Sequence, residues 1–512
     1  MKKRRVLSHF LFIVSILGLP DKIFSQNVGV GTSTPHTSAA LDVQSTNKGM
    51  LVPRMALTAA NVATPVSSPA DALLIYNTAT AGAGNNAVIP GFYYWNTTAS
   101  RWTSISGSVS GNGNAGFGTW GDCSMNNISE YNPKAADDGT AGDGMGTSVS
   151  ISGNYAITGA SGDDIGVNTD AGSAYIFYNN GGNWVQQQKL TPSDGAVNDG
   201  FGSGVSISGS YAIVGSPNDN IGANNTQGSA YIFFYNGSTW VQQQKLTAAD
   251  GATGDYFGYR VSIAGNYAVV TSMQDDIGAN AEQGSAYVYF YNGSSWVQQQ
   301  KLTASDGAAD DRFGSSVSVS GNYIIAGAGN DDNGATYDQG SAYIFFYNGS
   351  TWIQQQRIVA ADGAINDVFG SAVSIAGNYA VVGAYGDNVN GNSFQGSAYI
   401  FYYNGSTWVE QQKLTAPDGV ALDCLGISVS LSGNYVVLGS YADDVGSNSE
   451  QGSAYVFQNT NGIWSYLQKI TRPGASTNEY FGISCGVDNN RFVIGAHGVV
   501  NGRGMAFFGK IN

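Results

Sequence analysis

Short apolar segments alternate with polar, glycine-rich turns along most of the chain. Their short lengths and their content of valine, isoleucine, tyrosine and threonine are typical of β-strands. One stretch contains four such segments, at residues 204–208, 211–215, 229–235 and 239–247. Asn236-Gly237 joins the last two, and this pair is common in tight hairpins. The stretch therefore predicts a four-stranded antiparallel meander.

The third segment of this meander is apolar on both of its alternating faces. One face carries Ala230, Ile232 and Phe234, and the other carries Tyr231, Phe233 and Tyr235. A strand with two apolar faces needs packing partners on both sides. Four-stranded sheets that stack in this way are the blades of a β-propeller, so the pattern predicts that fold.

The meander recurs with a period of 56 residues. A tryptophan marks the fourth segment of each unit, at Trp184, Trp240, Trp296, Trp352, Trp408 and Trp464. An acidic residue precedes the first segment, at Asp143, Asp199, Asp255, Asp311, Asp367, Asp423 and Glu479. A period of this size indicates a repeat architecture. We therefore expect an all-β protein with a seven-bladed propeller of four-stranded antiparallel blades.

The last repeat unit is incomplete, because it lacks the tryptophan segment. Upstream of the first unit, residues 134–143 resemble residues 245–255 with one residue deleted. The N-terminal segment can therefore supply the fourth strand of the seventh blade, which would hide an open sheet edge. Removing residues 107–138 is expected to expose that edge.

Two dipeptides recur in step with the repeat. Phe-Gly stands at residues 201–202, 257–258, 313–314, 369–370 and 481–482, and Gly-Ala or Gly-Ser at 159–160, 215–216, 327–328, 383–384 and 495–496. Over about residues 115–512 the chain resembles the FG-GAP repeat family, in a form typical of Bacteroidota. The resemblance implies the seven-bladed propeller found at the head of integrin α chains and in many bacterial surface proteins.

The chain departs from the integrin pattern at the calcium loops. Integrin-type loops place a D-x-D-x-D-G run between the first two strands of a blade. Here that connection is Ser152-Gly153-Asn154 or an equivalent tripeptide, which is too short to wrap a cation. The calcium sites of that family therefore do not carry over to this chain.

The first part of the chain reads as an export signal followed by a separate module. Residues 1–25 combine a basic start with an apolar stretch and a small residue before Gln26, which is typical of a secretory signal peptide. Residues 26–106 resemble a β-rich N-terminal module of exported Bacteroidota proteins and of trimeric phage tail fibres, which implies a homotrimer. Residues 107–118 read as a Gly/Ser linker, and residues 119–512 form the propeller.

Composition narrows the classes of partner. The formal net charge is −15, with 21 basic and 36 acidic residues, so nucleic acid is an unexpected partner. No apolar stretch after the signal approaches the length of a membrane span, so we expect no membrane insertion after signal cleavage. The three cysteines, Cys123, Cys424 and Cys485, are scattered, and Cys485 occupies a slot that holds valine in other repeats, which favours a buried free thiol.

Strand alternation places most of the acidic residues on one pole of the propeller. The loops between second and third strands carry Asp163, Asp219, Asp275, Asp331, Asp387 and Asp443, and the blade-to-blade loops carry Asp194 and its equivalents. The six carboxylates are candidate ligands of a metal ion, calcium being the cofactor considered. The alternative is turn chemistry, because Asp and Asn bond nearby backbone N–H groups in loops.

Two further series have functional and structural interpretations. The six repeated tryptophans could stack on sugars, or they could pack blade against blade as periodic aromatic residues do in propellers. The basic residues at Lys189, Lys245, Lys301, Arg357, Lys413 and Lys469 are expected to solvate the outer strand and discourage edge pairing.

We expect an exported or cell-surface binding or adhesion protein rather than an enzyme, because the three histidines and three cysteines form no catalytic pattern. Its acidic pole would face an extracellular protein, a glycan or a cation. The loop residues that differ most between blades are the expected contact points: Met273, Gln274, Tyr337, Tyr385, Phe394 and Tyr441. The alternatives are a carbohydrate-active enzyme with an Asp pair on the same pole and a purely structural extracellular repeat protein.

Overall fold

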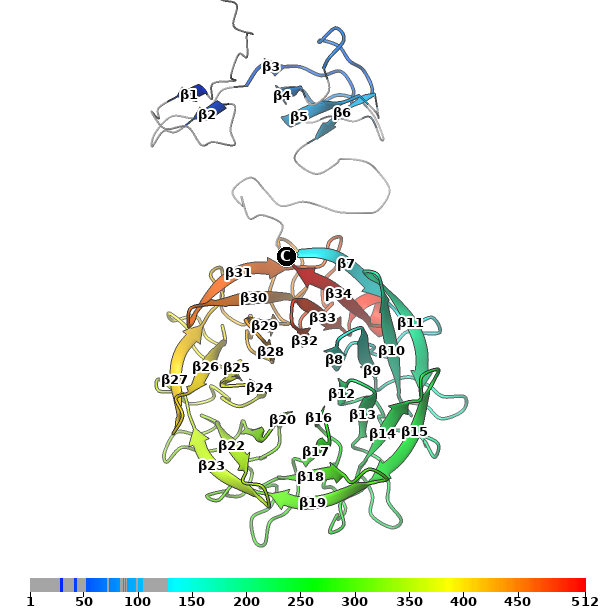
Figure 1. The fold of residues 1–512 in the computed structure, drawn as a ribbon, viewed down its shortest axis with the longest axis vertical. Coiled ribbons are helices and arrows are strands. Elements are labelled where there is room, and N and C mark those ends of the chain that lie inside the picture. Colours follow the sequence, from blue (N-terminus) through cyan, green and yellow to red (C-terminus); the bar gives the residue numbers. More distant parts are fainter. Residues whose placement is uncertain are drawn as a thin grey trace, which may run out of the picture. The chain divides into compact units, whose positions relative to one another are not determined.

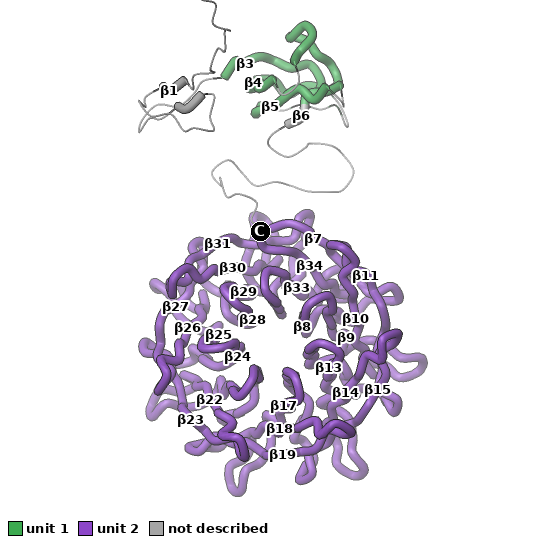
Figure 2. The backbone as a smooth tube through the Cα atoms, viewed as in Figure 1, with its two compact units in different colours: residues 1–117 green, residues 118–512 purple. Residues whose placement is uncertain are grey.

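The computed structural model describes residues 28–30, 41–43, 52–70, 73–82, 86, 88, 90–97, 100–104 and 128–512. The chain divides into two compact units, residues 1–117 and 118–512 (Figure 2). The predicted signal segment, residues 1–25, and the predicted linker, residues 107–118, lie outside the described residues.

The first unit is small and β-rich. Its strands are β1 (Val28–Val30), β2 (Leu41–Val43), β3 (Arg54–Met55), β4 (Leu74–Asn77), β5 (Gly91–Asn96) and β6 (Arg101–Ser104). β1 pairs with β2 in parallel, and β3 to β6 form a four-stranded sheet that ends in an antiparallel hairpin. Trp95 and Trp102 stack edge to face in its core, with ring centroids 5.3 Å apart.

The second unit is a ring of seven four-stranded sheets (Figure 1), which confirms the predicted propeller. The first strands of the blades are β8 (Val149–Ser152), β12 (Val205–Ser208), β16 (Val261–Ala264), β20 (Ser316–Ser320), β24 (Ala372–Ala376), β28 (Ser428–Ser432) and β32 (Ser484–Asp488). The second strands are β9 (Tyr155–Ala160), β13 (Tyr211–Ser216), β17 (Tyr267–Ser272), β21 (Tyr323–Ala328), β25 (Tyr379–Ala384), β29 (Tyr435–Ser440) and β33 (Arg491–Ala496).

The third and fourth strands complete each blade. The third strands are β10 (Ser173–Asn180), β14 (Ser229–Tyr235), β18 (Ser285–Tyr291), β22 (Ser341–Tyr347), β26 (Ser397–Tyr403), β30 (Ser453–Thr460) and β34 (Met505–Ile511). The fourth, outer strands are β11 (Asn183–Leu190), β15 (Trp240–Leu246), β19 (Trp296–Leu302), β23 (Trp352–Ile358), β27 (Trp408–Leu414), β31 (Ile463–Ile470) and β7 (Ile128–Lys134). A short helical turn, α1 (Val499–Gly502), precedes β34.

The ring is closed by strand β7, which comes from the start of the propeller and pairs antiparallel with the C-terminal strand β34. Residues 128–134 thus supply the fourth strand of the last blade, in the way that the incomplete seventh repeat predicts. Figure 1 shows β7 beside β34 at the junction of the first and last blades. Every blade therefore has four strands, although the last is built from both ends of the propeller.

The apolar core lies between neighbouring blades. One core cluster joins Ile213 and Ile232 of the second blade to Phe257, Tyr287 and Trp296 of the third. Equivalent clusters fill the other junctions. Both faces of the third strand are therefore buried, as its pattern of apolar residues predicts.

The Phe-Gly and Gly-Ala/Ser dipeptides hold neighbouring blades together at very close range. Phe257 is fully buried, and Gly258 adopts a positive φ of 99°. A Cβ at Gly215 of the preceding blade would collide with the carbonyl oxygen of Gly258. Only glycine fits both positions, so the motif reflects a backbone-to-backbone contact.

Candidate functional site

The two kinds of long loop lie together on one pole of the propeller, the variable-loop pole. It consists of the loops between second and third strands, at residues 161–172, 217–228, 273–284, 329–340, 385–396, 441–452 and 497–504, and of the blade-to-blade loops, at residues 135–148, 191–204, 247–260, 303–315, 359–371, 415–427 and 471–483. Parallel bridges such as Gly228↔Phe257 join the loop of one blade to the entry of the next. This confirms that the two kinds of loop share a face.

The six candidate metal ligands are buried, and each is engaged within its own blade. In the third blade, Asp275 Oδ2 accepts hydrogen bonds from Ser285 Oγ at 2.5 Å and Tyr287 OH at 2.9 Å, and it lies 2.7 Å from Lys301 Nζ. The same pairing with a basic residue recurs at Asp163–Lys189, Asp219–Lys245, Asp331–Arg357, Asp387–Lys413 and Asp443–Lys469. A positive side chain thus already stands beside every one of these carboxylates. Among the described residues, no group of three or more metal-type side chains is close enough to hold a metal ion.

A second carboxylate completes each of these ion pairs from the blade-to-blade loop. Lys301 Nζ lies 2.7 Å from Asp250 Oδ2, and Tyr287 OH donates to Asp250 Oδ1 at 2.9 Å. Burial alone would raise the pKa of Asp250, but the hydrogen bonds from Lys301 and Tyr287 outweigh it and lower that pKa. The basic residues therefore do not simply solvate the outer strand, and that expectation is wrong. They turn toward the variable-loop pole because two carboxylates stand within reach there.

The acidic residue before each first strand has a different environment. Asp255 is buried, and its Oδ2 accepts a hydrogen bond from the backbone N–H of Ala252 at 2.6 Å. This is the turn chemistry that its position in a loop predicts. Burial raises the pKa of Asp255, and it raises those of Asp311, Asp367 and Asp423 to about 6. In the described part of the chain, Asp367 Oδ1 is buried without a hydrogen-bond partner.

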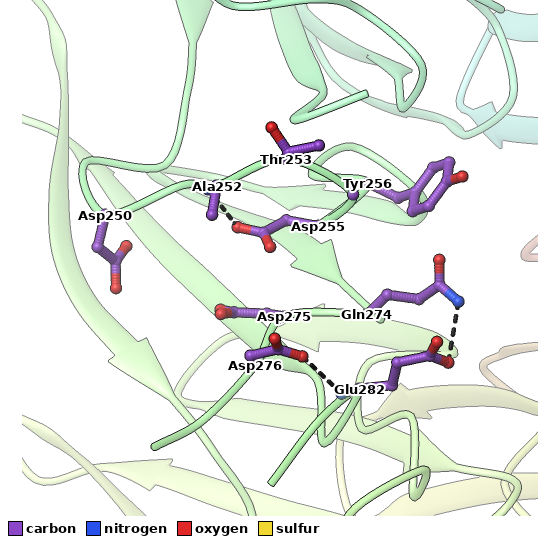
Figure 3. Close-up of a pocket in the computed structure, with 10 residues that line it drawn as sticks. Asp250, Ala252, Thr253, Asp255, Tyr256, Gln274, Asp275, Asp276 and Glu282 are labelled. Atoms are coloured by element: carbon purple, nitrogen blue, oxygen red, sulfur yellow. Dashed lines mark hydrogen bonds between the residues drawn. The ribbon is translucent and has the colours of Figure 1, made fainter. Parts of the chain in front are cut away.

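An acidic hollow of about 380 Å³ opens in the third blade between these loops (Figure 3). Its wall includes the carboxylates of Asp250, Asp255, Asp275, Asp276 and Glu282. These groups are bonded to the protein itself: Asp276 Oδ1 accepts from the backbone N–H of Glu282 at 2.9 Å, and Glu282 Oε2 accepts from Gln274 Nε2 at 2.9 Å. The carboxylates of the hollow therefore already have hydrogen-bond or ion-pair partners within the protein.

The six loop residues that were expected to contact a partner lie between second and third strands on this pole. Tyr337 is 66% exposed and Phe394 is 37% exposed, whereas Met273, Gln274, Tyr385 and Tyr441 are half-buried. Tyr441 packs on Tyr480 with ring centroids 6.0 Å apart. The six expected contact residues thus lie on one face, though only two of them are strongly exposed.

The sequence interpretation missed one variable position. It lies directly before the Phe-Gly dipeptide, or its equivalent, in each blade-to-blade loop. It is occupied in turn by Gly144, Gly200, Tyr256, Arg312, Val368, Cys424 and Tyr480. All seven adopt a positive φ, between 53° and 67°. A left-handed backbone is unfavourable for a branched or aromatic residue. A signal was present in the sequence, because this position varies freely beside a nearly constant phenylalanine.

The repeated tryptophans are packing residues. Their rings are at most 2% exposed. Trp296 contacts Tyr211 of the preceding blade edge to face, with centroids 5.5 Å apart. A sugar cannot stack on rings that are covered by protein, so blade packing is confirmed.

Two other candidate residues are also structural. Cys485 is a buried free thiol, as its valine slot predicts. His497 stacks on Tyr480 at 5.1 Å, and burial lowers its pKa. Among the described residues, the buried His497 Nδ1 has no hydrogen-bond partner.

The seven similar sheets, with close glycine contacts between them, define a repeat β-propeller whose loops vary on one pole. Comparison with family models identifies FG-GAP repeats at residues 135–177, 184–233, 240–289, 296–345, 352–401 and 408–457. The chain therefore belongs to the FG-GAP repeat family, whose propellers are of the extracellular adhesion type and typically non-catalytic. A phage tail like trimerisation region matches residues 29–117. None of the curated proteins compared with the chain matches it.

No helix among the described residues is long and apolar enough to cross a membrane.

Proposed function

We propose that this chain is an exported, cell-surface binding protein, without catalytic activity, that presents the variable-loop pole to an extracellular protein or glycan. The observation that carries the proposal is the contrast between the two poles. The turns on the opposite pole repeat almost unchanged, as at Asn236, Asn292, Asn348 and Asn404, where the side chain caps the following turn. The variable-loop pole differs in every blade. Variation confined to one face suits recognition, because a purely structural repeat has no reason to vary there.

The alternative of a glycoside hydrolase with an Asp pair is less well supported. A catalytic pair needs one carboxylic acid and one carboxylate free to reach the scissile bond. The repeated Asp250 and Asp275 are instead bonded to Lys301 and Tyr287 within their own blade. Five other blades have an equivalent pair beside a lysine or arginine, so the pair does not mark one blade as an active site.

A homotrimer through the N-terminal module is part of the proposal. The match of residues 29–117 to a trimerisation region supports it. Three propellers on one trimer would bind a repetitive surface with higher avidity than one. Light scattering on the mature chain should give three times the monomer mass, and a monomer mass would contradict this part.

Binding is tested with the full-length protein on arrays of glycans and extracellular proteins. The double variant Tyr337→Ser/Phe394→Ser removes two exposed aromatic residues from the variable-loop pole, and aromatic residues often dominate interfaces. We expect it to weaken binding by about tenfold or more. Ile463→Ser, at a 64% exposed position beside the opposite pole, is the matched control and should bind normally. Absence of binding to every array component, or equal loss in the control, would overturn the proposal.

A further inference from the structure

The junction of the first and second blades contains a hollow of about 330 Å³ on the variable-loop pole. Its walls are Ser161, Gly162 and Asp170 of the first blade and Asn198, Gly200, Ser203 and Asn218 around the entry of the second. This volume is at the lower end of the range for sites that bind small molecules. All the residues that line it are small or polar.

The hollow exists because this junction lacks a side chain that the five later junctions have, a feature that it shares with the junction before the first blade, where the residue is Gly144. The position of Gly200 holds Tyr256, Arg312, Val368, Cys424 or Tyr480 in the later blades. The backbone is the same, because φ is 63° at Gly200 and 54° at Tyr256. The space is therefore made by the missing side chain and not by a different loop path.

The same junction leaves a carboxylate without the donors that it has elsewhere. In the third blade Glu282 accepts hydrogen bonds from Gln274 at 2.9 Å (Figure 3) and from Arg312 at 3.0 Å. In the first blade the acidic residue is Asp170, but the amide position is Gly162 and the arginine position is Gly200. Asp170 is exposed, and within the described part of the chain its carboxylate faces solvent with no hydrogen-bond or ion-pair partner from the protein.

Three further polar side chains of the hollow are accessible to solvent. Among the described residues, no partner is found for the side chains of Ser161, Asn198 and Asn218. One of these groups points into the space of the missing side chain, because Asn218 Nδ2 lies 3.2 Å from where a Cβ of Gly200 would be. By contrast Asn330, the equivalent of Asn218 in the fourth blade, donates to Asp338 at 3.0 Å.

The chemistry of these four groups selects the ligand. A carboxylate only accepts hydrogen bonds, whereas two amides and a hydroxyl both donate and accept. A guanidinium or ammonium ion offers donors alone and would leave the amide N–H groups unpaired. An anion would be repelled by Asp170, and an apolar group would strand all four polar groups. Sugar hydroxyls both donate and accept, so they match the whole set.

From this we infer that the hollow between the first and second blades binds one sugar residue of a glycan, with Asp170, Asn198, Asn218 and Ser161 bonding its hydroxyls. This inference rests on the proposed binding function and names the class of ligand and the subsite within the variable-loop pole. The ring thus carries a saccharide subsite at a junction where glycine replaces the large side chain of the five later junctions.

The test is ligand-observed saturation-transfer NMR on the full-length protein with methyl glycosides of common hexoses, deoxyhexoses and N-acetylhexosamines. We expect saturation of at least one sugar. Gly200→Tyr fills the hollow with the residue that the third blade has at a similar φ, and it should abolish the signal. The strain of a tyrosine at this positive φ should lower the melting temperature by a few degrees without unfolding the propeller. Asn218→Ala should weaken binding by about tenfold, the loss for stranded hydrogen bonds. Asn330→Ala, whose amide is already bonded to Asp338, is the matched control and should bind normally.

Several outcomes would overturn the inference. Sugar binding that survives Gly200→Tyr would place the subsite elsewhere, and so would equal losses in Asn218→Ala and Asn330→Ala. Binding of N-acetylarginine amide without binding of any sugar would show that the hollow takes a cationic peptide side chain. If no sugar binds while the arrays still show binding at Tyr337 and Phe394, the saccharide subsite is refuted and the proposed function stands. If the arrays are also blank, both fail.

Discussion

At the scale of single residues, a repeated polar network stabilises the first six blades. Lys301 joins the buried carboxylate of Asp275 to the more exposed Asp250, and its ammonium group lies 5.2 Å from the centroid of the Tyr287 ring. Serine and tyrosine hydroxyls complete the bonding of Asp275. The network pins the variable-loop pole to the outer strand, so the loops can vary in sequence on a constant support.

Removing the basic residue should destabilise the propeller more than its surface position suggests. Lys301→Met would leave Asp275, whose side chain is 6% exposed, without its counter-charge. Because the lysine itself is one-quarter exposed, we expect a loss of about 2 kcal/mol rather than the full cost of breaking a buried pair. Denaturant unfolding measures the loss. Lys510→Met, which removes a looser pair 3.9 Å from Glu130, should cost under about 1 kcal/mol. Equal effects of the two variants would argue against this account.

Calcium should not change the stability of the propeller. The ammonium or guanidinium groups beside Asp163, Asp219, Asp275, Asp331, Asp387 and Asp443 already provide positive charge at the six candidate carboxylates. We expect the same melting temperature with millimolar calcium and with excess chelator. A calcium-dependent rise of several degrees would show that a cation binds the folded state and would support the metal interpretation.

The buried acids before the first strands predict a pH dependence of stability. Burial raises the pKa of Asp367 in the folded state to about 6, above the value of about 3.9 in the unfolded chain. The folded state therefore binds more protons between these values, and its stability falls as pH rises from about 4 to about 6. Asp367→Asn should flatten this decline in thermal unfolding curves.

Asp250→Asn is expected to change the pH dependence of stability in the opposite direction to Asp367→Asn. Lysine and tyrosine hydrogen bonds outweigh burial and lower the pKa of Asp250, so its stabilisation is present above the unfolded pKa and is lost as pH falls through the folded one. This variant should lose stability at neutral pH and little at acidic pH. The pH account would be refuted if Asp367→Asn and Asp250→Asn changed the pH profile in the same direction.

At the scale of elements, side-chain amides and hydroxyls join each blade to the next. The outer strand has one extra residue opposite the third strand, a β-bulge, between the partners Ile232↔Gln244 and Phe233↔Gln242. Gln244 then forms two hydrogen bonds with the backbone of Trp296 in the next blade, at 2.7 and 2.8 Å. At the inner end, the backbone N–H of Ile263 donates to Ser206 Oγ of the preceding blade at 3.1 Å.

Gln244→Ala tests this contact between blades. The change leaves both a backbone N–H and a carbonyl of Trp296 without their partner, so we expect a loss of about 1–3 kcal/mol in denaturant unfolding. Val241→Thr, on the same strand at a 43% exposed position, should change stability by less than about 0.5 kcal/mol. A loss no greater than that of the control would show that water replaces the glutamine.

At the scale of the whole molecule, closure of the ring depends on strand β7. Residues 506–511 of β34 pair with β7. Without β7, these residues would form an unpaired sheet edge. A deletion of residues 107–134 keeps Asp138, the ion-pair partner of Lys189. Among the described residues it removes only strand β7. We expect a melting temperature lower by several degrees and concentration-dependent association, measured by calorimetry and light scattering.

Removal of residues 26–106 is the control for this deletion. These residues belong to a separate compact unit, so the melting of the propeller should not change. If the variant without β7 melts at the temperature of the full chain, ring closure by this strand does not contribute to stability.

Much of the fold follows from local patterns in the chain. The predicted segments 211–215 and 229–235 correspond to β13 (Tyr211–Ser216) and β14 (Ser229–Tyr235). Alternation of apolar residues and turn dipeptides depends on near neighbours, which is why the sequence reveals it. The role of the lysine series does not follow in this way, because Lys301 bonds to Asp250 and Asp275 on two different loops.

By itself, the sequence determined the β-meander, its period of 56 residues, the seven blades and the pole on which the loops gather, because strand alternation and repetition are properties of the chain alone. Only the tertiary structure decided which groups are already bonded and which are free. It placed a basic side chain beside each candidate metal ligand, and it left the Asp170 carboxylate without a partner among the described residues, beside Gly162 and Gly200. Hydrogen bonds depend on distances between residues far apart in the chain, and those distances exist only once the blades are packed.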